Sequence, residues 1–102
     1  MVIEWLKIKL KPELREHFVQ KDAEIWTAAL AQCAGFLGKE VWINPEDLTE
    51  VVLVIRWRSR AQWKAFPAHE LKQLEHQMAQ VLEDAYQIVE VAEYQVRKFA
   101  PE

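Results

Sequence analysis

The stretch FLGKEVWINPEDLTEVVLVIRW, residues 36–57, decides the fold because it reads as two strands joined by a tight turn. Phe36–Asn44 alternates between an apolar face and a mixed face, which is the pattern of a half-buried strand. Asn44 then begins the turn cluster Asn-Pro-Glu-Asp. Val51–Trp57 is apolar on both faces apart from Arg56, which predicts a buried strand. The short connection makes the pair a β-hairpin.

The segment before this hairpin predicts a strand followed by a helix. Val2–Leu10 places apolar residues at every second position, and this alternation predicts the strand. Pro12 suits the first turn of a helix, and apolar residues recur beyond it at helical spacing. Gly35 is a suitable left-handed cap, so we expect the helix to end there.

The segment after the hairpin predicts more helix and a last strand. Ser59 is a suitable N-cap for a short helix that continues to about Phe66. A second helix is predicted over residues 68–85 from its regular apolar stripe. Residues 87–99 are rich in Val, Ile, Tyr and Phe and predict the final strand.

The resulting β-α-β-β-α-β order is that of an α+β, ferredoxin-like fold in one domain, residues 1–102. Its four-stranded antiparallel sheet packs both helices on one face. The other face should be polar in a monomer, yet Val52 and Val54 share it in the third predicted strand. We therefore expect a homodimer that forms through the open sheet face.

Composition excludes several classes of function. The net charge of −3 and pI of about 5.6 argue against nucleic-acid binding. Cys33 is the only cysteine, so an intrachain disulfide is impossible. The run Val51–Ile55 is far shorter than the roughly 20 residues that span a bilayer, which predicts no membrane insertion. The first residues lack the pattern of a signal peptide, so we expect a cytoplasmic protein.

Five tryptophans in 102 residues are the least ordinary feature of the composition. Trp26, Trp57 and Trp63 are predicted to line an aromatic pocket for a flat apolar ligand. The alternative for each is packing in the core or in a dimer interface. Asp22 interrupts the apolar region of the first helix, near the edge of its stripe. If it is half buried, its pKa rises and it can act as a catalytic base; the alternative is an exposed or Arg-paired carboxylate.

Other polar residues give weaker indications of a functional site. Arg56 lies in an apolar strand and is predicted to bind an anion in the cleft, or alternatively to form an ion pair at the rim of a dimer. Asn44 completes the set of candidate ligand-binding residues. His17, His69 and His76 lack the spacing of a metal site, so we expect surface histidines and no metal.

The chain resembles an uncharacterised family of short proteins found mainly in cyanobacteria. More distantly it is similar to the antibiotic biosynthesis monooxygenase superfamily of dimeric α/β barrels. The stretches that carry the first resemblance are MVIEWLKI (residues 1–8), EIWTAAL (24–30), GFLGKEVWINP (35–45), VLVIRW (52–57) and AEYQVRKF (92–99). The second rests on Gly35-Phe36 entering one strand and Trp57-Arg58-Ser59 leaving the next.

The resemblance implies a dimeric α/β barrel and leaves two functions open. One is a cofactor-free oxygenase acting on a small aromatic or apolar molecule. The other is a non-catalytic dimer that binds a small ligand or a protein partner. The haem-degrading branch carries an Asn on strand one and a haem-ligating His ten residues after a Trp. Here Phe66 stands at the Trp position, His76 follows, and strand one has no Asn, so we expect no cofactor.

Overall fold

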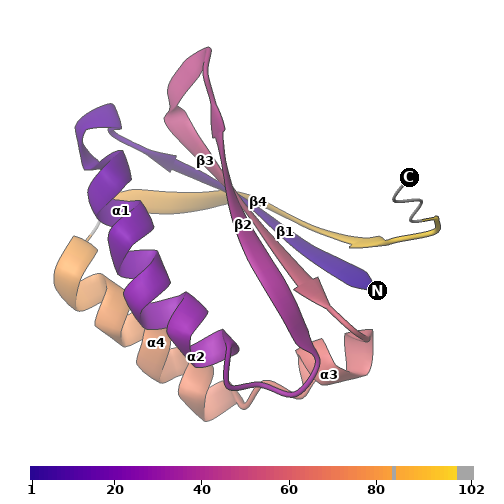
Figure 1. The fold of residues 1–102 in the computed structure, drawn as a ribbon. Helices are drawn as coiled ribbons and strands as arrows, with labels where there is room; N and C mark the ends of the chain where they lie inside the picture. The colour runs from indigo at the N-terminus through magenta and orange to yellow at the C-terminus, as the bar shows by residue number, and fades with distance from the viewer. Residues whose placement is uncertain (84, 99–102) are drawn as a thin grey trace.

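The computed structural model describes residues 1–83 and 85–98 and has the predicted β-α-β-β-α-β order (Figure 1). A 3-10 turn at Pro12–Leu14 opens the first helical segment, and a π-helical turn at Ala23–Thr27 lies inside it. The strands and helices are β1 (Val2–Leu10), α1 (Arg15–Asp22), α2 (Ala28–Leu30), β2 (Phe36–Asn44), β3 (Asp47–Trp57), α3 (Arg60–Lys64), α4 (Ala68–Leu82) and β4 (Tyr86–Gln95).

The four strands form one antiparallel sheet in the order β2-β3-β1-β4. Helices α1 and α4 lie side by side against one face of this strongly twisted sheet (Figure 1). The ferredoxin-like α+β fold predicted from the sequence is therefore confirmed. No helix in the described part of the chain has the length and apolarity that a membrane crossing requires.

The β2-β3 hairpin is longer and tighter than the sequence indicated. β3 begins at Asp47 and not at Val51, so only Pro45 and Glu46 separate the two strands. The reason is a set of side-chain bonds: Asp47 Oδ1 accepts from the Thr49 N–H at 3.0 Å, and Lys9 Nζ lies 2.8 Å from Asp47 Oδ2. These bonds hold the pKa of Asp47 well below its usual range and extend the ladder beyond the apolar run.

The other end-points differ slightly from the predictions. β4 begins at Tyr86 and ends at Gln95, and Phe99, the predicted end, lies outside the described residues. α4 ends at Leu82, a few residues before the predicted end at 85. The N-cap prediction is confirmed, because the Ser59 hydroxyl accepts from the Gln62 N–H at 3.1 Å.

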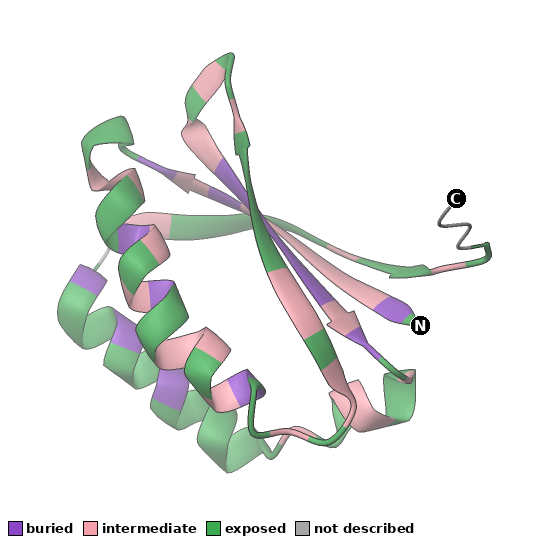
Figure 2. Ribbon diagram, in the orientation of Figure 1, coloured by how far each residue is buried: buried purple, intermediate pink, exposed green. Residues whose placement is uncertain are grey.

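The core lies between the sheet and the helices and runs along the central strands (Figure 2). Trp57, Phe18 and Ile8 are its largest fully buried apolar side chains. On the opposite face, Val54 is only 2% exposed even in the single chain, because longer neighbours on the flanking strands cover it. Trp42 and Tyr94 remain exposed, at 48% and 58%.

Candidate functional site

Two adjoining cavities open between the helices and the inner face of the sheet. The first has a volume of about 200 Å³ and the second about 210 Å³. The residues that line both are Glu4, Trp26, Leu30, Ile55 and Leu71. Together the cavities reach the range of about 300–1,000 Å³ that is usual for small-molecule sites.

Asp22 lines the first cavity and is buried, with 2% of its surface exposed. It lies on the buried face of its helix and not at the edge that the sequence predicted. The π-helical turn explains the shift: the Ala28 N–H donates to the Ala23 carbonyl, five residues earlier. Such a turn holds more residues than an α-helical turn, so Trp26 and Leu30 continue the buried line of Phe18 and Asp22.

Asp22 forms an ion pair with Lys39 across the cavity wall. Lys39 Nζ lies 2.5 Å from Asp22 Oδ2, and each side chain is only 3% exposed. Burial raises the pKa of the Asp22 carboxyl, and the Lys39 ammonium offsets part of that rise. Among the described residues, Oδ2 has no hydrogen-bonding partner beyond this ammonium. Neither alternative reading of Asp22, as an exposed or an Arg-paired carboxylate, is correct.

Glu4 stands at the junction of the two cavities. Trp57 Nε1 donates to Glu4 Oε1 at 3.3 Å. Burial raises the pKa of Glu4, while the Trp57 bond and then the charges of Lys39 and Lys64 lower it. A second carboxyl of altered acidity therefore faces the same space as Asp22.

Sequence reasoning missed both Glu4 and Lys39, although the pattern carried a signal. Glu4 shares its strand face with Leu6, Ile8 and Leu10, and Lys39 shares its face with Leu37, Val41 and Ile43. A charged residue on the apolar face of a strand needs a partner or a function. Each of the two lines the first cavity.

The second cavity is the aromatic one. Trp57, Trp63 and Phe66 line it together with Trp26, so the structure brings the three predicted tryptophans to one space. Lys64 Nζ lies 4.0 Å from the centre of the Trp63 ring, in a cation–π contact. The capped helix α3 (Arg60–Lys64) positions both of these side chains.

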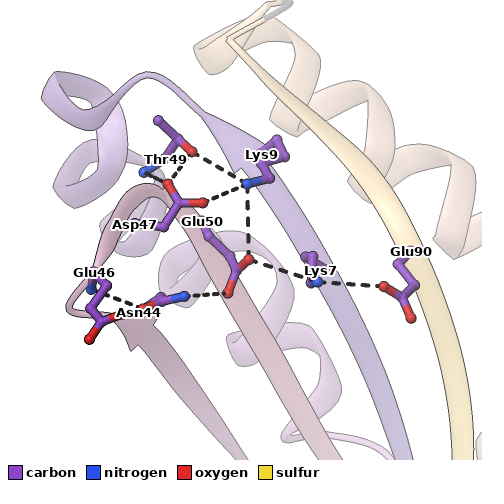
Figure 3. A network of polar contacts seen from close by, with 8 residues as sticks. All are labelled: Lys7, Lys9, Asn44, Glu46, Asp47, Thr49, Glu50 and Glu90. Atoms are coloured by element: carbon purple, nitrogen blue, oxygen red, sulfur yellow. Dashed lines mark hydrogen bonds and ion pairs between the residues drawn. The ribbon is translucent and has the colours of Figure 1, made fainter.

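Asn44 and Arg56 line neither cavity, so the structure does not bring them together with the three tryptophans. Asn44 lies at the hairpin, where it accepts from the Glu46 N–H and donates to Glu50 within a network of polar contacts (Figure 3). Arg56 lies on the outer face because strand residues alternate, and its Nη2 is 3.4 Å from Glu40 Oε1. This contact is an ion pair, as in the alternative reading of Arg56, whose place at the rim of a dimer stays a prediction.

The three histidines are exposed, as predicted. No group of three His, Cys, Asp or Glu side chains in the described part of the chain is arranged to hold a metal ion. Cys33 is partly buried, and its Sγ donates to the Ala29 carbonyl at 3.7 Å.

Solved structures with the same fold come from proteins of different activity. SnoaB from Streptomyces nogalater, a cofactor-independent oxygenase, is 16% identical with a TM-score of 0.73, over 99% of this chain and 97% of that one. The haem-degrader MhuD from Mycobacterium tuberculosis is 14% identical with a TM-score of 0.75, over 99% and 100%. A conserved protein from Methanosarcina mazei Go1 is 15% identical with a TM-score of 0.67, over 92% and 90%. A comparison with curated proteins finds no match.

The residues around the cavities do not fit a haem group. No histidine lines either cavity, and His76 lies on the exposed side of α4. The polar groups of the first cavity are carboxylates, a tyrosine and a lysine already held in an ion pair. An imidazole ligand of the kind expected in the haem-degrading branch is therefore not in place.

The sequence itself carries the family relationship that the fold suggests. The model of the antibiotic biosynthesis monooxygenase family matches residues 1–77, from β1 into α4. This is well over half of the chain and includes Asp22, Trp26, Lys39 and Trp57. The chain therefore belongs to the antibiotic biosynthesis monooxygenase family.

Proposed function

We propose that the protein is a cofactor-free oxygenase that oxidises a small aromatic or apolar molecule bearing an acidic C–H group. The observation that carries the proposal is the buried Asp22 carboxyl, which faces a largely apolar cavity opposite the Lys39 ammonium. A carboxylate in such surroundings is a stronger base than one in water, because burial raises the pKa of Asp22.

Asp22 and Lys39 have different roles in the proposed reaction. Asp22 takes the proton from the activated carbon, and the electron pair left on that carbon reduces O₂. The Lys39 ammonium stabilises the negative charge that develops on the conjugated oxygen of the ligand. For a CH₂ group the balance is R₂CH₂ + O₂ giving R₂C=O + H₂O. The carbon supplies all four electrons, so no further reductant is required.

The test is oxygen uptake with a panel of aromatic ketones and phenols that carry activated CH₂ groups. Asp22→Asn should lower kcat/KM by about 10²–10⁴-fold, the usual contribution of a general base. Asp47→Asn removes a carboxylate at the hairpin that lines neither of the two cavities, and it should leave the rate unchanged. With ¹⁸O₂ the ketone should carry one labelled atom. An Asp22→Asn variant with the rate of the native protein would refute the assignment.

A second candidate is a non-catalytic ligand-binding protein, which the tryptophan-lined second cavity favours. Tryptophan fluorescence titrated with the same panel separates the two. Saturable quenching without oxygen uptake for any compound supports a binding protein, and oxygen uptake supports the enzyme.

The proposal includes a homodimer, a dimeric α/β barrel, that forms through the outer face of the sheet. Its support is the exposed aromatic surface of Trp42 and Tyr94 on that face. A cytoplasmic location is also proposed, in keeping with the single thiol Cys33. The cyanobacterial relationship stays a prediction.

A further inference from the structure

One row of residues crosses the inner face of the sheet beside the cavities. The strand register places Lys39 opposite Ile55, Ile55 opposite Glu4, and Glu4 opposite Glu93. Side chains in register on one face are neighbours, so charged members of the row influence one another.

Two of the charged residues in this row form ion pairs, and one does not. Lys39 pairs with Asp22, and Arg60 Nε lies 2.8 Å from Glu93 Oε2. Among the described residues, Glu4 takes part in no ion pair, and its bonded partner is the neutral Trp57 N–H. Its neighbour in the row on β4 is another carboxylate. Glu4 is therefore a carboxyl in a partly enclosed site with no cation in ion-pair contact among the described residues, although the more distant charges of Lys39 and Lys64 lower its pKa.

The other charged residues that line the cavities form no ion pair with Glu4 among the described residues. Glu75 adds a third carboxylate to the lining of the first cavity. Lys64, the cation of the second cavity, lies over the Trp63 ring. It forms no ion pair with Glu4 among the described contacts, although its charge lowers the pKa of Glu4. With the Asp22–Lys39 pair counted as neutral, two lining carboxylates, Glu4 and Glu75, face one ammonium, that of Lys64. The lining therefore has net negative charge, which disfavours an anionic ligand and favours a cationic one.

We propose that the ligand of this site carries a protonated amine that pairs with Glu4 while its apolar part fills the two cavities. This inference rests on the proposed function, since it names the class of molecule that the cavities take. Trp26 and Trp57 line the second cavity together with Glu4 and supply apolar surface for the rest of the ligand. A positive charge on the ligand also makes its neighbouring C–H group more acidic, which suits removal of the proton by Asp22.

The experiment compares three ligands of equal shape by calorimetry at neutral pH and low salt. They are 2-naphthylethylamine, 2-naphthylethanol and 2-naphthylacetate, which differ mainly in charge. The amine should bind about tenfold or more tightly than the alcohol, and the carboxylate most weakly. Glu4→Gln should abolish most of the amine's advantage, since its amide oxygen still accepts from Trp57 but carries no charge.

Glu46→Gln is the matched control. It changes the net charge equally at an exposed position of the hairpin, so it should leave the order of the ligands unchanged. A native protein that binds the carboxylate as tightly as the amine overturns the proposal, and so does a Glu4→Gln variant that keeps the amine's advantage. Absence of binding by all three overturns it as well.

The outcomes also separate this inference from the oxygenase proposal. A Glu4-dependent preference for the amine without oxygen uptake for any substrate leaves the inference standing and removes the oxygenase. Oxygen uptake that depends on Asp22, with no preference among the three ligands, supports the oxygenase proposal and overturns the inference about the amine.

Discussion

Lys39 Nζ lies 2.5 Å from Asp22 Oδ2, and the two side chains are each 3% exposed. This ion pair joins α1 to β2, an edge strand of the sheet, across the wall of a cavity. Removing two charges from water is costly, and their attraction must offset that cost. A pair in this position is a weak source of stability, which is consistent with a role in binding or catalysis.

Breaking the ion pair should destabilise the fold more than replacing it. Asp22→Ala leaves the Lys39 ammonium buried without a partner and should lower the free energy of unfolding by about 3–5 kcal/mol. The double variant Asp22→Leu with Lys39→Met fills the same space without charge and should recover most of that loss. Urea titrations of the single and double variants measure both effects. A double variant no more stable than Asp22→Ala would show that the pair does not act as a unit.

Asp22 should make stability and activity respond to pH in opposite directions. Burial raises its pKa in the folded state, so between the unfolded and folded pKa values the folded state binds more protons. Stability therefore falls as pH rises through that window. A base must be ionised, so kcat/KM rises through the folded pKa.

The measurement is a set of urea titrations at several pH values, compared with the Asp22→Leu, Lys39→Met variant. The native protein should lose stability relative to this variant as pH increases from the acid side. The variant retains Glu4, but it loses the Lys39 charge that lowers the pKa of Glu4. Glu4→Gln is therefore introduced into both proteins, so that the difference between them reports the ion pair. If the native protein instead gained stability relative to the variant as pH increases over this range, the predicted direction of the pH dependence would be wrong.

Gly35 and Gly38 allow a matched test of how much backbone strain and a steric clash each cost in stability. Each has a positive φ, of 88° and 155°, which residues with a side chain rarely adopt. A Cβ at Gly35 would also collide with the Gln62 side chain, whereas one at Gly38 would meet open space. Gly38→Ala should cost about 1 kcal/mol, and Gly35→Ala clearly more. Thermal unfolding measures both, and equal losses would mean that Gln62 moves aside freely.

The proposed dimer should depend on the outer face of the sheet. Light scattering after gel filtration should give the native protein twice the chain mass of 12.1 kDa. Trp42→Glu places a charge on this face beside Glu40, whose carboxylate now accepts from the Trp42 N–H, and should yield monomers. Val81→Glu makes the same change on the exposed part of α4 and should leave the dimer intact. A native protein of single-chain mass would refute the dimer.

The sequence by itself determined the order of the elements. Apolar residues alternate over Val2–Leu10 and Phe36–Asn44, and they recur at helical spacing between and after these segments. Both are local patterns, which can be recognised in the sequence without knowledge of tertiary contacts. The Ser59 cap and the exposed histidines followed from the same local rules. The sequence also predicted that Trp26, Trp57 and Trp63 line one cavity, because large aromatic side chains favour the interior.

Only the tertiary structure decided which charged residues meet. Asp22 faces Lys39 because a π-helical turn keeps its side of the helix buried and because the β2-β3 register sets Lys39 opposite Ile55. The same register leaves Glu4 between Ile55 and Glu93, with no ion-pair partner among the described residues. Local periodicity indicates the face of each residue but not the partner across the sheet or the helix above it. Those partners depend on strand register and helix docking, which the whole chain fixes together.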